Sequence, residues 1–335
     1  MSSLPVDIMT NILSRLEVKC ILRYRCVCKP WDKLLRTPQF VKMHLSRAIE
    51  NEDVSFIVRS NAEHMYSTDY QKKSLFTFSD DDVVEIDFPF KSISHFRYAV
   101  VEDSCDGLLF LEICSGDSLF NGLWNPSTRE YKTLPMETVE FSCPLSSEIP
   151  ILHSITYGFV YDSNIEDYKV VKVMDLGPHG SEISVYTLTS NSWRDEGIQE
   201  VLKPQDVNVS NVTLGLLGEY LCLVSQHPMA RSDVWVLKDH GVTNSWTKLF
   251  SVNQQTAIDG CGILNPIFAF KSGEILIENM NDFNLFVYDP EHGSVIIPKV
   301  RGTPMCSYYT TINVRSLVSL DSGTYVGQEE PGETT

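Results

Sequence analysis

The strongest constraint on the fold is a strand–turn–strand pattern that recurs about every 50 residues. Each copy places an aromatic residue in a short apolar strand, and a polar turn and a second strand follow. The first-strand aromatics are Trp124, Tyr186, Trp235 and Tyr288, which are separated by 62, 49 and 53 residues. A repeat of this length with about four short strands is typical of β-propeller blades. A two-layer sandwich is the alternative, but it needs no such period.

The regular position of these aromatics also bears on their role. They could form a sugar-binding platform, but one aromatic at the same place in each repeat favours core packing between blades. Strands at residues 54–58, 75–78 and 83–88 are expected to supply a further blade. Residues 315–320 are expected to form a last strand that pairs back to the first blade, because closure removes exposed sheet edges.

The first 45 residues have a different, helical pattern. Pro5 stands at a favoured first helical position, and Ile8, Ile12, Leu13 and Leu16 recur at helical spacing. Further helices are expected from residue 18, after Pro30 and after Thr37-Pro38. So short a segment cannot bury all its apolar side chains by itself. They either pack on the β-domain or bind a separate helical partner, and the pattern leaves both open.

Charge divides the chain in the same place. The formal net charge is −17. Residues 1–50 hold nine Lys/Arg and four Asp/Glu, a net of +5, which leaves −22 for the rest. The acidic part argues against nucleic-acid binding, which needs a basic surface. The basic helical part favours an acidic protein partner.

No motif for chemistry is visible. The sequence has no G-x-S-x-G, no Gly-rich phosphate loop and no H-E-x-x-H, and its eight histidines are scattered. The nine cysteines follow no metal or disulfide spacing. We therefore expect no catalytic residue, no metal and no cofactor. No apolar run approaches the ~20 residues of a membrane span, and no signal peptide is visible, so we expect no membrane association and a place in the cytoplasm, the nucleus or both.

The helical stretch resembles an F-box. The matching positions, in order, are Leu4-Pro5-x-Asp7-Ile8, Ile12-Leu13-x-x-Leu16, Val18-Lys19, Leu22-x-Tyr24-x-Cys26-Val27-Cys28-Lys29-x-Trp31 and Pro38-x-Phe40-x-x-x-His44-Leu45. Glu17 and Cys20 depart from the plant pattern, which usually has Pro and Ser there. Neither change removes an apolar anchor.

The rest of the chain resembles the F-box-associated β-propeller domain of plant F-box proteins. Its marks are Cys105-Asp106-Gly107-Leu108-Leu109, Trp124-Asn125-Pro126-Ser127-Thr128-Arg129, Leu134-Pro135, Tyr157-Gly158-Phe159, Asp167-Tyr168-Lys169-Val170-Val171, Ser192-Trp193-Arg194, Asp233-Val234-Trp235-Val236, Ser245-Trp246-Thr247-Lys248, Tyr288-Asp289 and Ser316-Leu317-Val318. The family includes S-locus F-box proteins and F-box proteins that limit plant immune receptors. The motifs do not choose between these subgroups.

The resemblance implies the substrate receptor of an SCF-type ubiquitin ligase, a non-catalytic subunit. Its F-box would bind a Skp-type adaptor and, through it, cullin and RING subunits, while the propeller would bind an unknown target protein. The implied adaptor-binding residues are Leu4, Pro5, Ile8, Ile12, Leu13, Leu16, Ile21, Leu22, Val27, Cys28 and Trp31. Two alternatives remain open: a non-degradative scaffold that binds the adaptor alone, and a propeller enzyme or lectin with a helical cap.

The expected domains are an F-box at residues 1–46, a propeller at 47–320 and a disordered tail at 321–335, which is rich in Gly, Glu and Thr. The target would contact variable loops, for which the candidates are residues 115–119, 140–150, 177–181, 227–232 and 239–243. Their target-binding residues are unknown.

The propeller also departs from the family in length. Family members usually carry a further blade-length segment after the positions of Ser192-Trp193-Arg194. Here Leu214 follows Trp193 by only 21 residues, similar to the 24 between Tyr131 and Ile155. The spacing predicts that one whole repeat is missing, which leaves five blades in place of six or an imperfectly closed ring.

Overall fold

The structure is a computed structural model of the 335-residue chain. It describes residues 5–59, 64–69, 77–78, 83–91, 93–136, 154–175, 181–199, 212–217, 220–227, 231–237, 246–253, 264–279, 284–297, 299–300 and 308–326. The chain divides into two compact units. Unit 1 contains residues 1–72, 78–134 and 302–335, and unit 2 contains residues 73–77 and 135–301.

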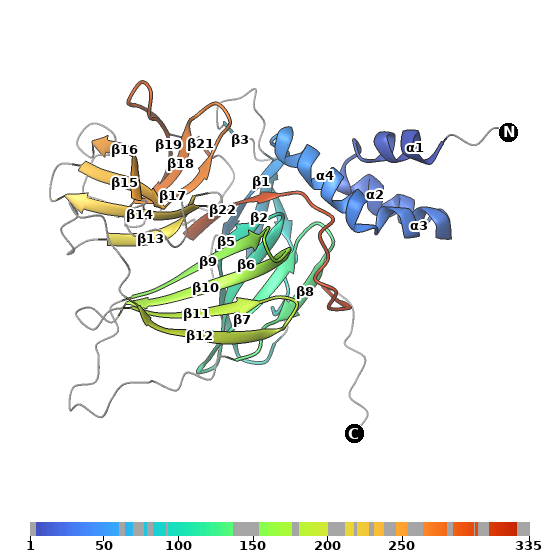
Figure 1. The fold of residues 1–335 in the computed structure, drawn as a ribbon, viewed down its shortest axis with the longest axis horizontal. Helices are drawn as coiled ribbons and strands as arrows, with labels where there is room; N and C mark the ends of the chain where they lie inside the picture. The colour runs from blue at the N-terminus through green and yellow to red at the C-terminus, as the bar shows by residue number, and fades with distance from the viewer. Residues whose placement is uncertain are drawn as a thin grey trace. The chain divides into compact units, whose positions relative to one another are not determined.

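Four short helices begin unit 1 (Figure 1): α1 (Val6–Leu13), α2 (Val18–Arg25), α3 (Lys29–Leu35) and α4 (Pro38–Glu50). Helices α2 and α4 begin at the predicted positions, whereas α3 begins at Lys29, one residue before Pro30. The Thr37 side chain accepts a hydrogen bond from the Phe40 amide at 3.3 Å, which caps α4. Helix α4 continues four residues past the expected boundary at residue 46. Among the described residues, no helix is long and apolar enough to cross a membrane.

Two antiparallel sheets complete unit 1. The first has the order β22 (Tyr308–Val314), β1 (Val54–Arg59), β2 (Met65–Asp69) and β4 (Val83–Ile86). The second has the order β23 (Thr324–Tyr325), β8 (Glu130–Thr133), β7 (Ser118–Asn125), β6 (Leu108–Ser115) and β5 (Phe96–Cys105).

A late segment does pair back to the first blade, but it is not the predicted one. Strand β22 pairs with β1, with Ile312 opposite Phe56. Residues 315–320 were expected to be that strand, and this is corrected: they form no strand. Their backbone groups instead bond to two buried side chains, Asn125 and Glu130. No local sequence pattern signals those distant partners.

The start of the predicted disordered tail is also corrected. Residues 324–325 form β23, with Thr324 paired to Tyr131, and the Val326 amide donates to the Arg129 carbonyl at 2.9 Å. Residues 327–335 lie outside the described residues.

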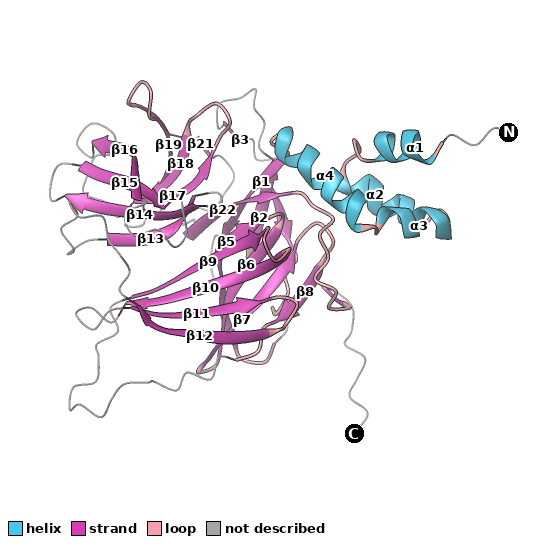
Figure 2. Ribbon diagram, in the orientation of Figure 1, coloured by secondary structure: helices cyan, strands magenta, loops and turns pink. Residues whose placement is uncertain are grey.

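Three further sheets form unit 2, and in each of them neighbouring strands are consecutive and antiparallel (Figure 2). The first contains β9 (Ser154–Asp162), β10 (Asp167–Asp175), β11 (Ser181–Thr187) and β12 (Ser192–Gln199). The second contains β13 (Val212–Leu217), β14 (Tyr220–His227), β15 (Arg231–Leu237) and β16 (Trp246–Asn253). The third contains β17 (Leu264–Ala269), β18 (Ile275–Asn279), β19 (Asn284–Asp289) and β20 (Ser294–Ile296). A short pair joins β3 (Thr77–Phe78) and β21 (Lys299–Val300).

These sheets confirm the predicted fold class. In the part of the chain that the structure describes, the helices are followed by five antiparallel sheets of four or five strands, the blades of a five-bladed β-propeller. The repeat aromatics pack as predicted: Trp124, Tyr186 and Tyr288 are buried, and Trp193, Trp235 and Trp246 are half-buried. Their position inside the blades removes most of their surface from any ligand.

Candidate functional site

The helical domain has its own core. Leu13, Val18, Ile21, Leu35 and Phe40 are all buried in one cluster, which Leu317 from the far end of the chain completes. The cluster draws on every helix, because each contributes an apolar stripe at helical spacing. It therefore fixes which sides of the helices face outward.

Polar contacts hold the helices in this arrangement. The Arg25 guanidinium donates to the Leu35 carbonyl at 3.1 Å, which ties α2 to the end of α3. Arg47 of α4 donates to the Asn11 carbonyl of α1 at 2.9 Å. The rings of Tyr24 and Trp31 meet edge to face, with centroids 5.6 Å apart. These contacts fix how the helices pack against one another.

Large apolar side chains remain on that outer surface. Ile8 is 49% exposed, Ile12 is 50% exposed, and both lie on α1 four residues apart, on one side of the helix. Val27, between α2 and α3, is 63% exposed. Pro5 and Cys28 are exposed as well. We call Pro5, Ile8, Ile12, Val27 and Cys28 the apolar helical surface.

The structure divides the predicted adaptor-binding residues into three groups. Those of the apolar helical surface are open to a partner. Leu16, Leu22 and Trp31 are half-buried against the helical core, so each offers part of its side chain. Leu13 and Ile21 are corrected from contact to core residues, because burial leaves them almost no surface to offer. Leu4 lies outside the described residues.

Sequence analysis missed two exposed apolar residues on the same helices. Val6 of α1 and Ile49 of α4 are both exposed. Val6 stands beside the predicted stripe, and only the packing of α1 shows that it faces outward. The predicted helical pattern ended at residue 45. Ile49 lies four residues beyond it, in a part of α4 that was not expected to be helical.

The helical domain also presents positive charge. Lys19 and Arg23 lie four residues apart on α2, and Lys29 and Lys33 lie four residues apart on α3. All four side chains are exposed. Basic side chains beside exposed apolar ones suit a partner that is acidic around an apolar patch.

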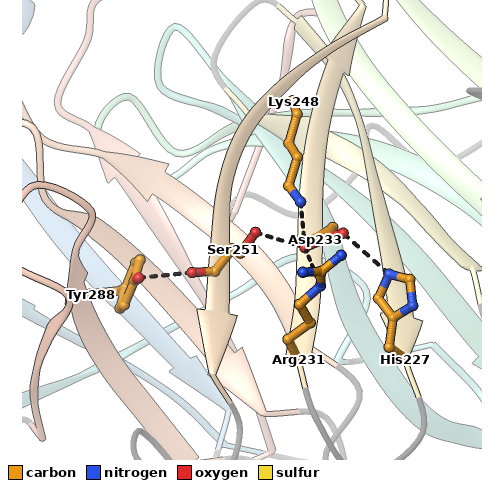
Figure 3. A network of polar contacts seen from close by, with 6 residues as sticks. All are labelled: His227, Arg231, Asp233, Lys248, Ser251 and Tyr288. Atoms are coloured by element: carbon orange, nitrogen blue, oxygen red, sulfur yellow. Dashed lines mark hydrogen bonds and ion pairs between the residues drawn. The ribbon is translucent and has the colours of Figure 1, made fainter. Parts of the chain in front are cut away.

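A second polar cluster lies in unit 2, around Asp233 of β15 (Figure 3). Its side chain is 4% exposed, yet Lys248 Nζ and Ser251 Oγ lie 2.8 and 2.7 Å from Oδ1. Arg231 Nε lies 3.3 Å from the same oxygen, and His227 Nε2 lies 3.1 Å from Oδ2.

The contacts of Asp233 stabilise the packing of neighbouring strands. Burial acts to raise the pKa of Asp233, but hydrogen bonds from Lys248 and Ser251 outweigh it and hold the pKa below its usual value. The carboxylate joins β14, β15 and β16. Ser251 also connects to the next blade, since its carbonyl accepts a hydrogen bond from the Tyr288 hydroxyl at 2.8 Å. Three of the four contacts are to Oδ1 and one is to Oδ2, so among the described residues the carboxylate is held mainly by structural contacts between strands.

The structure also bears on metal binding, which was not expected, and on the five loops that were predicted to contact a target. In the described ranges, no three His, Cys, Asp or Glu side chains gather as metal ligands would. Of the five loops predicted to contact a target, residues 115–119 are described and carry the exposed Leu119. Residues 140–150 and 239–243 lie wholly outside the described residues, and of 177–181 only residue 181 is described. Half of 227–232 is described, and His227 and Arg231 of this loop contact Asp233.

Comparison with known proteins agrees with this division into helices and blades. Residues 1–45 match the F-box-like family, and residues 55–215 match the F-box associated beta propeller domain. The chain belongs to the F-box proteins that carry an F-box associated β-propeller domain.

The similar sequences include plant F-box proteins. The chain is 25% identical over 388 residues to the F-box protein CPR1 of Arabidopsis thaliana, a match that covers 95% of this chain and 89% of the relative. It is 27% identical over 306 residues to an F-box/kelch-repeat protein of the same plant, covering 75% and 79%. A solved nidogen/laminin complex matches 78% of this chain and 99% of its own at 8% identity, with a TM-score of 0.39, too low to support an argument.

The family comparison also bears on the missing repeat. The domain match ends at residue 215, inside β13, the first strand after the point where a repeat was predicted to be absent. The described blades number five, as that prediction requires.

Proposed function

We propose that this chain is the substrate-recognition subunit of an SCF-type ubiquitin ligase. Its helices would bind a Skp-type adaptor, and through the adaptor cullin and RING subunits, while its propeller would bind a target protein for ubiquitination. The chain would carry out no covalent chemistry itself. It would raise the concentration of target lysines near the conjugating enzyme. Such a protein would work in the cytoplasm, the nucleus or both.

The observation that carries this proposal is the exposure of Ile8, Ile12 and Val27 on a domain whose core is already complete. An exposed apolar set on a rigid frame is typical of a protein-binding surface. Full burial of one such side chain contributes about 1.5–3 kcal/mol, so three partly exposed ones can support a stable complex.

Binding to a purified Skp-type adaptor tests the proposal directly. We expect the full-length chain to bind with a Kd at or below about 1 μM, the value that corresponds to about −8 kcal/mol. Ile12→Asp should weaken binding by about 10-fold or more, because it places a charge in an apolar contact. Isothermal titration calorimetry measures both.

Ile165→Asp is the matched control, since it makes the same change at a similarly exposed position in the turn between β9 and β10, outside the helical domain. Its affinity should stay close to wild type. Absence of binding by the wild-type chain would contradict the proposal and leave the enzyme or lectin alternative. Adaptor binding with no change in the abundance of any captured partner, after the ligase is inhibited in cells, would favour the non-degradative scaffold.

A further inference from the structure

The C-terminal segment, residues 315–326, lies between the helices and the second sheet of unit 1. On the helical side, Leu317 is 1% exposed and belongs to the same apolar cluster as Leu13 and Phe40. It is the one member of the described cluster that does not come from residues 9–43. A residue from the far end of the chain thus completes the core of the helical domain.

On the blade side, Asn125 at the end of β7 holds the same residues. Its side-chain Nδ2 donates to the Val318 carbonyl at 2.7 Å and to the Ser316 carbonyl at 3.3 Å. Its Oδ1 accepts from the Ser127 amide at 2.9 Å. Asn125 is fully buried, so these bonds replace water that the side chain has lost.

Glu130 at the start of β8 holds the next residues. Its buried carboxylate accepts hydrogen bonds from the Ser319 hydroxyl at 2.8 Å and from the amides of Leu320 and Ser322 at 3.0 Å each. A charged acceptor with several donors gives stronger bonds than a neutral one. The segment then joins β8 as strand β23.

The two ends of the segment have further partners, one in the link that follows the helices and one at the ends of α2 and α3. At its start, Arg315 Nη1 lies 2.8 Å from Asp53 Oδ1, in the link between α4 and β1. At its other end, Tyr325 lies within electrostatic reach of Arg25 and Arg36, which end α2 and α3. The segment therefore meets the helical domain at Leu317 and near Tyr325, and it meets the blade from residue 316 to residue 325.

We infer that residues 315–326 are a positioning element that fixes the helical domain on the blades of unit 1. The inference rests on the proposed function: an adaptor bound to the helices delivers the conjugating machinery, and a target is held by the propeller. A rigid connection between the helical domain and the blades keeps the conjugating machinery and the target at a fixed separation. A flexible connection lowers the effective concentration of the target near that machinery. Leu317, Asn125 and Glu130 are the positioning residues.

Two labels in unit 1 test this rigidity in the full-length chain. Noncanonical amino acids are placed at Lys33 of α3 and Asp117 of the β6–β7 turn, and each carries a spin label. This route avoids labelling the nine native cysteines. Both positions are exposed. Pulsed electron–electron double resonance then gives the distribution of distances between the label on the helix and the label on the blade. We expect one narrow distribution for the otherwise unaltered chain.

Glu130→Gln should make this distribution roughly twofold broader, because mobility between domains is the default once their joint is weakened. Adaptor affinity should stay within about twofold of wild type, since sites without shared partners act independently. A role in stability alone would lower the melting temperature without broadening the distribution. Glu85→Gln, the same change at an exposed carboxylate of β4, is the matched control and should change neither.

Leu317→Ala should broaden the distribution further. If that variant loses helical circular dichroism, Asn125→Ala replaces it and has the same expected outcome. A broad distribution in the parent chain, or an unchanged one in Glu130→Gln, would overturn the inference. A wild-type chain that shows a narrow distribution but no adaptor binding would overturn the proposed function alone.

Discussion

The Nε2 atom of His44 lies 2.9 Å from the carbonyl oxygen of Leu16, a residue 28 positions earlier in the chain. This bond ties α4 to the connection between α1 and α2. His44 is buried, and burial lowers the pKa of its imidazole below the usual 6.5. The neutral ring is therefore part of the folded helical domain.

A pH dependence follows from His44. Its pKa is lower in the folded than in the unfolded chain, so below pH 6.5 the unfolded chain binds more protons. The contribution of His44 to stability is complete above pH 6.5 and is lost as the pH falls toward the folded-state pKa. We expect the melting temperature to fall from pH 7 to pH 5. In His44→Gln this fall should be smaller, and an equal fall in both proteins would contradict the assignment.

Glu102 on β5 should act in the opposite direction. Glu102 as a whole is exposed, but loss of water around its carboxyl group, followed by the neighbouring carboxylates of Glu112 and Asp103, raises its pKa to about 7. The folded chain then holds this proton more tightly than the unfolded chain, so stability falls as the pH rises from about 4.5 to about 7. Glu102→Gln should raise the melting temperature at pH 8 and leave it little changed at pH 5. A lower melting temperature at pH 8 would show that the carboxylate has a stabilising partner.

Leu13 and Ile12 are neighbours in α1 with opposite environments. Leu13→Ala should destabilise the helical domain by about 2–5 kcal/mol, because it opens a cavity in the core. Ile12→Ala should cost well under 1 kcal/mol in stability and should act on adaptor binding instead. Helical circular dichroism during thermal unfolding measures the first effect. Equal destabilisation by the two variants would mean that α1 is packed differently.

Asp233 should stabilise its blade through the contacts in Figure 3. Asp233→Asn removes the charge that Lys248 and Arg231 face, so we expect a loss of about 2–3 kcal/mol, measured by thermal unfolding at pH 7. Asp117→Asn is the control, because that side chain is fully exposed and its contact with Arg97 is 3.6 Å long. If both variants melt alike, the Asp233 network contributes no net stability.

Gly107, between β5 and β6, tests the contact between a blade turn and the C-terminal segment. Its φ is +85°, and an added Cβ would collide with the Ser316 side chain and the Val314 carbonyl oxygen. Gly107→Ala should therefore cost more than about 2 kcal/mol, from backbone strain and overpacking together. Gly116 also has a positive φ but open space, with its nearest atom 3.9 Å away. Gly116→Ala should cost only about 1 kcal/mol.

Much of the local structure could be predicted from the sequence. Thr37-Pro38 marks the start of α4 because a hydroxyl cap and a first-turn proline satisfy needs that any helix has. Trp124 and Tyr186 mark equivalent strands because a repeated blade places its large side chains at repeated positions. These signals act over a few residues or recur at a fixed interval, so they can be read without coordinates.

The candidate site could be predicted only in part. Ile8, Ile12 and Leu13 belong to one apolar stripe in the sequence, but Leu13 is buried while Ile8 and Ile12 are exposed. The direction that α1 faces depends on partners elsewhere in the chain, including Leu317. Periodicity shows that a helix has an apolar side, not which part of that side remains open.

The sequence by itself therefore determined the kinds of element, their order and the family, because helix caps, blade repeats and motif spacing are local or periodic. Tertiary structure alone decided which apolar residues of the helices stay exposed and what the segment after β22 contacts. Asn125 and Glu130 bond to residues about 190 positions later, and such contacts are set by folding in three dimensions. Because of these contacts, residues 315–320 link the helical domain to its blade and do not form the expected strand.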